Sequence, residues 1–139
     1  INKRNLFVVK INWENKLLVQ GQELDVKQLR AKAKEFIANP EDKADMPKLF
    51  EEDFGQPFGT LKYTKEHVIS VQNDMETQYQ AYLDVQNELV AAYNELREEC
   101  AQKYFHKSYN ELDEEWQKKI SKIYPQKISE AEPKNYGGK

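Results

Sequence analysis

The chain has 139 residues, of which 39% are hydrophobic and 32% charged, and its mean hydropathy is -0.93. This length and composition predict one domain, residues 1–139, with a thin core and a heavily solvated surface. The net charge is -3, from 21 basic and 24 acidic residues that are intermixed, so no field of one sign attracts a polyanion and we expect no nucleic acid partner. The single cysteine, Cys100, excludes an intrachain disulfide.

The first predicted elements form a hairpin. From Leu6 to Trp13, one set of alternate positions is apolar throughout, the period of two that is typical of a half-buried strand. This set is Phe7, Val9, Ile11 and Trp13, and it alternates with Val8, Lys10 and Asn12. After the polar turn at Glu14 and Asn15, residues 17–19 resume an extended pattern that ends before Gly21. The two segments are therefore expected to pair as a hairpin.

A helix is predicted next. Asp25 followed by Gln28 has the form of a capping box, and Pro40 predicts that the helix ends at Asn39, because proline disfavours helical geometry in the residue before it. The apolar residues between them recur at helical spacing: Val26, Leu29, Ala33, Phe36 and Ile37.

Residues 41–65 are interpreted as a long inserted loop. Two prolines and two glycines lie among acidic residues, and the scattered aromatic side chains Phe50, Phe54 and Phe58 are expected to tether the loop to the domain. Residues 59–63 are expected to add a short edge strand to the sheet.

The most β-prone run of the chain is residues 67–72, a predicted buried strand that ends at Asn73 and Asp74. Thr77 is then expected to cap a helix with Gln80 at its third position. This helix would be about 40 Å long. Its expected apolar stripe consists of Tyr79, Tyr82, Leu83, Leu89, Val90, Tyr93, Leu96, Cys100 and Tyr104.

The C-terminal part is predicted to cover the far end of that helix. Asp113 is expected to cap a further helix bearing Leu112, Trp116, Ile120 and Ile123, which ends at Tyr124 before Pro125 and packs as an antiparallel partner. Residues 126–130 predict a closing strand through Ile128, and residues 133–139 a flexible tail. The predicted fold class is α+β: a two-layer domain with a small mixed sheet packed against two helices, plus an added C-terminal helix and the inserted loop.

No residue pattern predicts catalysis or a bound cofactor. His67 and His106 lack partners at metal-ligand spacing, and surface or strand-edge roles are expected for both. Cys100 lies on an apolar helical stripe, where an inert thiol is expected. The acidic runs at 51–53 and 113–115 lack the order of a calcium loop, so no metal site is predicted. Exposed strand edges in a chain without catalytic or metal-binding motifs are typical of a binding module.

The chain begins at Ile1 instead of Met, and no run of apolar residues approaches the roughly 20 required to cross a bilayer. This start is typical of a fragment cut after a signal or membrane anchor, and equally of a proteolytic product.

The order hairpin, capped helix, apolar strand ending in Asn-Asp, and long helix resembles the periplasmic domain of the ExbD and TolR family of biopolymer transport proteins, especially the longer ExbD-like proteins of Bacteroidota. The resemblance covers well over half of the chain. The matching blocks are residues 9–12 and 16–25 with Leu29, residues 67–74 with Thr77 and Tyr79, residues 85–89 and 92–97, and residues 123–125 and 128–134.

The resemblance implies a single-span inner-membrane protein with this domain in the periplasm, reaching the membrane only through a helix absent from this chain. It implies a homodimer that works with an ExbB-like channel and passes proton-motive energy to a TonB-like protein. The protonatable aspartate of the family lies in that membrane helix. By match with the family's blocks, Asp74, Tyr79, Ile128 and Glu130 are expected to be interaction positions, and Asp74 and Tyr79 equally structural ones.

Three other functions remain open from the residues. A TolR- or MotB-like domain would bind peptidoglycan or envelope scaffolds, an accessory domain would require a neighbouring enzyme, and a small hydrolase would depend on Cys100 or His67. Residues 41–65 and 98–124 depart from the short form of the family, so extra structure is expected to cover surfaces that are open in shorter relatives.

Overall fold

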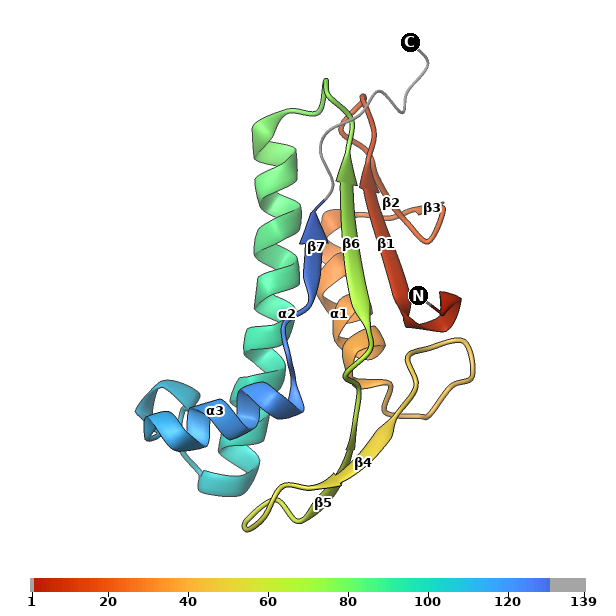
Figure 1. Ribbon diagram of the computed structural model, residues 1–139. Coiled ribbons are helices and arrows are strands. Elements are labelled where there is room, and N and C mark those ends of the chain that lie inside the picture. The colour runs from red at the N-terminus through yellow and green to blue at the C-terminus, as the bar shows by residue number, and fades with distance from the viewer. Residues whose placement is uncertain (1, 131–139) are drawn as a thin grey trace.

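Five strands form a mixed sheet, and two helices cover one of its faces (Figure 1). The computed structural model describes residues 2–130, so the tail predicted at 133–139 lies outside the described residues. The order across the sheet is β3-β2-β1-β6-β7. The strands are β1 (Leu6–Ile11), β2 (Leu17–Val19), β3 (Gln22–Glu23), β6 (Val68–Asn73) and β7 (Ile128–Glu130).

The pairing confirms the predicted hairpin, the central strand and the closing strand. β1 pairs antiparallel with β2 and parallel with β6, and β6 pairs parallel with β7. β1 ends at Ile11 and does not reach Trp13 as predicted. The reason is local, because the Asn12 side chain accepts hydrogen bonds from the Glu14 and Lys16 amides and starts the turn early.

Helix α1 (Val26–Ala38) confirms its predicted signals. Asp25 and Gln28 form the capping box, and Asn39 ends the helix in the left-handed conformation, with a φ of 40°. Together with helix α2 (Tyr79–Phe105), it packs on the sheet and encloses the sheet cluster. We use this name for the buried residues Phe7, Val9, Ile11, Leu17, Val19, Leu29, Ala33, Phe36, Ile37, Ile69, Val71, Val85, Leu89, Ala92, Tyr93 and Leu96.

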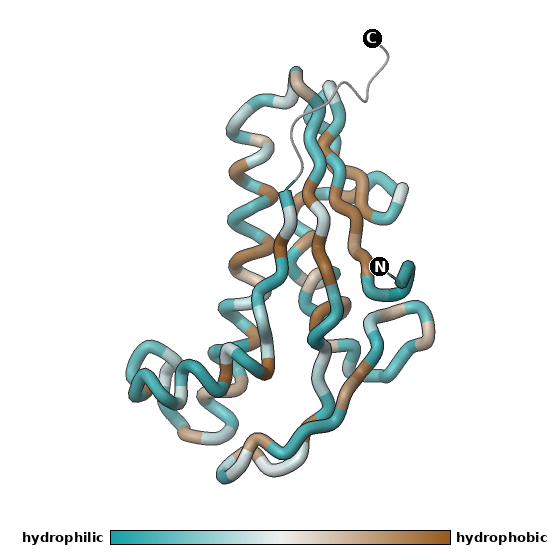
Figure 2. Tube along the Cα trace, in the orientation of Figure 1, coloured by the Kyte–Doolittle hydropathy of each residue, from teal (hydrophilic) through white to brown (hydrophobic). Residues whose placement is uncertain are grey.

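Within the sheet cluster, the strands obey the period of two. Along β1 and β6, buried residues alternate with half-buried ones, so one face of each strand contacts the helices. Figure 2 shows hydrophobic segments along β1 and β6, and hydrophobic positions alternating with hydrophilic ones along α2. The predicted α+β class, with a small mixed sheet against two helices, is confirmed.

The interpretation of residues 41–65 as a loop is wrong for its second half. β4 (Phe50–Asp53) and β5 (Thr60–Tyr63) pair antiparallel in a separate two-stranded sheet. The strand expected at 59–63 exists, but it does not join the edge of the main sheet. The connection turns at Gly55 and Gly59, which have φ of +76° and +68°, a region that glycine enters without strain.

Helix α2 has 27 residues, which corresponds to about 40 Å as predicted. It begins at Tyr79 with Gln78 as its N-cap, so the expectation that Thr77 caps it is wrong. The Thr77 hydroxyl instead donates to the Ile11 and Asn12 carbonyls at 3.2 Å each. This contact ties the start of α2 to the end of β1.

Helix α3 (Glu114–Ile123) ends before Pro125, as predicted, and Asp113 is its N-cap without a side-chain capping hydrogen bond. It lies across the lower end of α2 and not alongside it as an antiparallel partner (Figure 1). Two short 3₁₀ helices, Lys3–Asn5 and Tyr109–Glu111, complete the described elements.

Between α3, the end of α2 and the β4–β5 hairpin lies the aromatic cluster. The expected tethering by Phe54 and Phe58 is confirmed here, since both are buried in it. The rings of Phe58 and Tyr104 lie 5.0 Å apart, and those of Phe105 and Trp116 also 5.0 Å. Its buried members are Phe54, Phe58, Tyr63, Cys100, Ala101, Leu112, Ile120 and Ile123, and Phe50, Leu61, Tyr104, Phe105, Tyr109, Trp116 and Tyr124 pack around them.

Candidate interaction site

Asp74 lies fully buried at the end of β6. Its amide donates to the Ile11 carbonyl at 3.0 Å, and its carboxylate accepts from the Glu76 amide at 2.9 Å. Its own carbonyl accepts from the Thr77 amide at 3.0 Å. Asp74 therefore stabilises the turn that carries the chain from the sheet into α2, which is a structural role.

Tyr79 is 73% exposed, so its predicted place on the buried stripe of α2 is wrong. Its ring lies 6.3 Å from the ring of Tyr82, whose hydroxyl donates to the Glu130 carboxylate. The pKa of Tyr82 is raised, first by burial and second by this hydrogen bond. Tyr79 and Glu130, two of the predicted interaction positions, are thus joined on one surface through Tyr82, which the sequence pattern placed in the core.

Strand β7 forms one edge of the five-stranded sheet. The Ile69 amide donates to the Lys127 carbonyl at 2.9 Å, and Ile69 is in register with Ile128. Backbone groups of successive residues in a strand point to alternate sides, so Lys127 and Ser129 face β6, whereas Ile128 and Glu130 direct their N–H and C=O groups away from it. The Ile128 side chain packs against the sheet cluster.

The expectation that His67 lies at the surface or a strand edge is wrong, because its side chain is fully buried. Its Nε2 lies 2.9 Å from the Tyr93 hydroxyl, which also accepts from the Lys127 amide at 3.2 Å. The tautomer of the neutral imidazole decides whether the Tyr93 hydroxyl donates to Nε2 or accepts from it, and in either case Nδ1 lacks a hydrogen bond within residues 2–130. The three residues connect β6, α2 and the entry to β7.

Burial lowers the pKa of His67 to about 4, and the charge of Lys127 adds to this effect, while the Pro125 backbone opposes it. Burial also raises the pKa of Tyr93 to about 12. Both groups are neutral near pH 7 and hold the chain just before β7. A second contact also holds the chain before β7, since the Arg97 guanidinium donates to the Tyr124 carbonyl at 2.9 Å and 3.2 Å.

The sequence pattern did not predict that the hydroxyls of Tyr82 and Tyr93 form hydrogen bonds between α2 and distant segments. The sequence indicates such a hydrogen bond only in that a tyrosine on an apolar helical stripe has a hydroxyl that requires a partner when it is buried. The partners, Glu130 and His67, lie far away in the sequence and could not be identified from spacing.

Cys100 is buried in the aromatic cluster, and burial raises the pKa of its thiol to about 11. A thiolate nucleophile is therefore disfavoured, which weighs against the hydrolase interpretation. No group of three metal-ligating side chains is found within residues 2–130.

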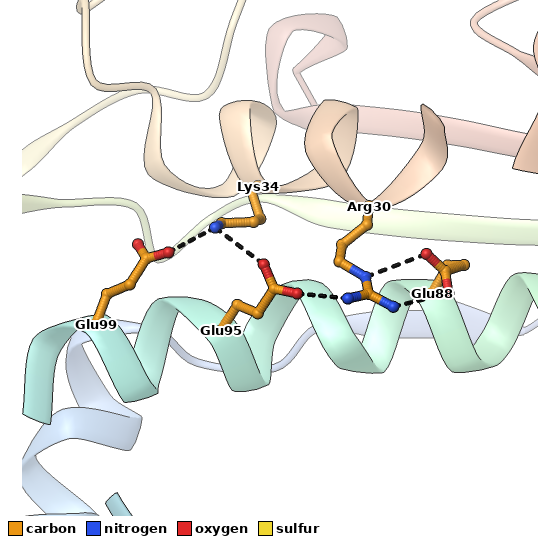
Figure 3. Close-up of polar contacts among 5 residues, drawn as sticks. All are labelled: Arg30, Lys34, Glu88, Glu95 and Glu99. Atoms are coloured by element: carbon orange, nitrogen blue, oxygen red, sulfur yellow. Dashed lines mark hydrogen bonds and ion pairs between the residues drawn. The ribbon is translucent and has the colours of Figure 1, made fainter. Parts of the chain in front are cut away.

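The outer side of α1 and α2 carries a groove of about 850 Å³ lined by charged residues of both helices. Arg30 contacts Glu88 at 3.0 Å and Glu95 at 2.6 Å, and Lys34 contacts Glu95 at 3.1 Å and Glu99 at 2.6 Å (Figure 3). These ion pairs lower the pKa of Glu95, with the Arg30 hydrogen bond as the largest cause. The positive charges on α1 are neutralised by the negative charges on α2. The ion pairs therefore join the two helices, and the groove presents little net charge to a ligand.

Across the described part of the chain, helices with the length and apolarity of a membrane span are not found.

A comparison with protein families finds a match to the family described as biopolymer transport protein ExbD/TolR, over residues 2–97. The match covers β1, β2, β3, α1, β6 and most of α2 in their order along the chain, and it includes the β4–β5 hairpin. A comparison with curated proteins finds no match.

Proposed function

The chain belongs to the ExbD/TolR family of biopolymer transport proteins, and we propose that it is the periplasmic domain of a single-span inner-membrane protein that works with an ExbB-like channel. In this proposal, it passes proton-motive energy to a TonB-like protein by direct contact and without catalysis. The family is a transport-associated and non-enzymatic one. A homodimer is part of the proposal.

The observation that supports a contact role is the free side of β7. The backbone groups of Ile128 and Glu130 face away from β6, and β7 has no further strand beside it within the described residues. Such an edge can bind an extended segment by strand addition, in which main-chain hydrogen bonds provide the affinity. We propose that a TonB-like segment pairs with this edge.

The scale of the energy agrees with such a mechanism. Moving one charge through a membrane potential provides about 2.3 kcal/mol per 100 mV, which is enough to shift a docking equilibrium. Three side-chain anchors, from His67 with Tyr93, from Arg97 and from Tyr82, keep β7 in register with the sheet while a partner binds its outer side.

The test uses two substitutions at one position. Glu130→Pro removes the outward N–H and obstructs pairing, whereas Glu130→Gln keeps the backbone group. Binding of a periplasmic TonB fragment, measured by co-precipitation and titration, is expected to weaken about 10-fold or more with Glu130→Pro and little with Glu130→Gln.

Purified peptidoglycan serves as the second ligand in the same experiment. Retention of the chain by peptidoglycan but not by the TonB fragment would favour a TolR- or MotB-like role and contradict the proposal. Equal binding of the TonB fragment by both variants would contradict strand addition at β7.

A further inference from the structure

Helix α2 extends past the sheet at the free side of β7. The Tyr82 hydroxyl donates to the Glu130 carboxylate, and the Lys127 amide donates to the Tyr93 hydroxyl, so α2 runs alongside β7. In Figure 1, α2 lies beyond β7 on the side away from β6. A strand that paired with the free side of β7 would therefore lie over α2.

One side of α2 is directed to this position. Glu88 and Glu95 form the ion pairs with α1, and Val90 follows Glu88 by two residues, which corresponds to a rotation of about 200° around the helix. Leu83 precedes Val90 by about two helical turns, so both side chains lie on the side away from α1. Arg97 follows Val90 by the same interval, and its guanidinium donates to the chain that enters β7. This side of α2 therefore adjoins the free side of β7.

Leu83 and Val90 are half-buried apolar side chains that belong to neither core. Within residues 2–130, neither is among the side chains that form the sheet cluster or the aromatic cluster, or that pack against them. Between them, the Gln86 side chain donates to the Tyr82 hydroxyl at 3.0 Å. Tyr79 lies about one turn before Leu83 and is 73% exposed. We call Tyr79, Leu83 and Val90 the outer row of α2.

The spacing of the outer row fits an extended chain. Leu83 and Val90 are about 10 Å apart along the helix axis, and side chains on one face of a strand are about 7 Å apart. A strand added to β7 would lie about 4.8 Å from it, with alternate side chains directed at α2. Two or three such side chains would cover the outer row.

The opposite face of β7 has different neighbours. Ser129 is exposed and is in register with Ser70, and Lys127 is exposed two residues earlier on the same face. Side chains of the added strand on this face would contact polar groups and solvent. The site therefore selects a segment in which apolar residues alternate with polar ones.

A segment without a helix of its own fits this position better than a second copy of the chain. If two copies paired through β7, the two strands would be about 4.8 Å apart, and the α2 helix of each copy would lie over the junction. Packed helices require about 8–10 Å between their axes. The two α2 helices would therefore be too close, whereas a lone extended segment avoids this conflict.

We propose, resting on the strand addition at β7 proposed above, that the outer row of α2 selects the partner segment by its side chains. The segment is an extended one from another protein, with apolar residues at every second position and polar residues between them. Its apolar side chains pack on Leu83, Val90 and Tyr79, while its backbone pairs with β7. The β7 backbone thus provides the pairing, and α2 provides the specificity.

The experiment begins with selection of short random peptides displayed on phage against the whole chain. The enriched peptides are expected to have Val, Ile, Leu or aromatic residues at every second position. The most enriched peptide is then synthesised and titrated into the chain by calorimetry, and hydrogen exchange is measured in the complex. The amides of Ile128 and Glu130 are expected to exchange more slowly, because they face the bound strand.

Substitutions on α2 test the outer row. Leu83→Gln and Val90→Gln introduce a polar residue that favours helices, and they are expected to weaken peptide binding about 10-fold or more with unchanged circular dichroism. Leu83→Met keeps an apolar side chain of similar size and should bind the peptide like the parent chain. Asn87→Gln, in the groove between α1 and α2, is the matched control with no expected change.

The outer row and the TonB partner can fail separately. Peptide binding that is lost in Glu130→Pro but unchanged in Leu83→Gln and Val90→Gln would overturn the role of the outer row and leave strand addition in place. Alternating peptides that bind through the outer row, together with a TonB fragment that does not bind, would support the outer row and contradict the TonB partner.

Three further results would overturn the role of the outer row. These are a selection that enriches no peptide, enriched peptides without alternation of apolar and polar residues, and sedimentation that shows two copies of the parent chain joined in a dimer that dissociates in Leu83→Gln.

Discussion

The two hydrophobic clusters found within residues 2–130 differ in the kinds of side chains and elements that form them. The sheet cluster contains mainly aliphatic side chains from regular strands and two helices, whereas the aromatic cluster combines a two-stranded hairpin with a short helix and the end of α2. Helix α2 contributes to both, with Leu96 as its last buried residue in the first and Cys100 as its first in the second. The family match ends between them, at residue 97.

This difference explains the length of α2. A helix of 27 residues would extend beyond a small sheet, and its far half is covered here by a core of its own. The β4–β5 hairpin and α3 therefore have a structural role, because together they bury the end of α2. The two clusters are therefore expected to respond differently to substitution.

The largest expected effect is that of Phe58→Ala, which removes the ring at the centre of the aromatic cluster and should cost about 3–5 kcal/mol locally. Hydrogen exchange should show loss of protection in β4, β5 and α3, with protection retained in β1 and β6. Ile69→Ala in the sheet cluster is the matched change and should reduce protection throughout. Equal loss in both variants would show that the clusters unfold as one unit.

A second effect, intermediate in size, concerns His67, at the passage from the hairpin to β6. Its pKa is about 4 in the folded chain and about 6.5 when unfolded, so the unfolded state binds more protons between these values. The stability provided by the neutral imidazole is complete above pH 6.5 and decreases as the pH falls toward 4. Unfolding by urea should show a loss of about 2 kcal/mol between pH 7 and pH 5.

The control for this prediction is the second histidine. His67→Phe should lose most of the pH dependence between pH 7 and pH 5, whatever its stability at pH 7. His106→Asn, at the exposed left-handed end of α2, should keep the dependence. If the pH dependence of stability persists in His67→Phe, titratable groups other than His67 cause it.

The smallest expected effect concerns the ion pairs that join α1 to α2. Glu95→Gln weakens contacts with Arg30 and Lys34 and should cost less than about 1 kcal/mol, because the groups are exposed enough for solvent to screen them. The loss should decrease in high salt, as measured by thermal unfolding. Glu114→Gln on α3, whose ion pair with Lys118 spans 3.9 Å, is the control with no expected change.

The two regions also differ in how far they could be predicted. The hairpin of β1 and β2, the capping box of α1 and the boundary of α3 were predicted correctly, because each depends on neighbouring residues. The β4–β5 hairpin was interpreted as a loop because its prolines, glycines and acidic residues lack a regular period, and its strands are stabilised by contacts with α2 and α3. Aromatic residues in that segment indicated a tether but not its geometry.

For the candidate site, the sequence by itself determined where the chain turns and which residues follow the central strand. It placed Asp74 at the end of β6 and Glu130 on a closing strand, because strand periodicity and turn residues act locally. Only the tertiary structure decided that His67 is buried, that Tyr79 is exposed and that Tyr82 joins it to Glu130. The burial or exposure of these side chains depends on how β7 and the start of α2 pack against the rest of the domain. Residues that are distant in the sequence determine this packing.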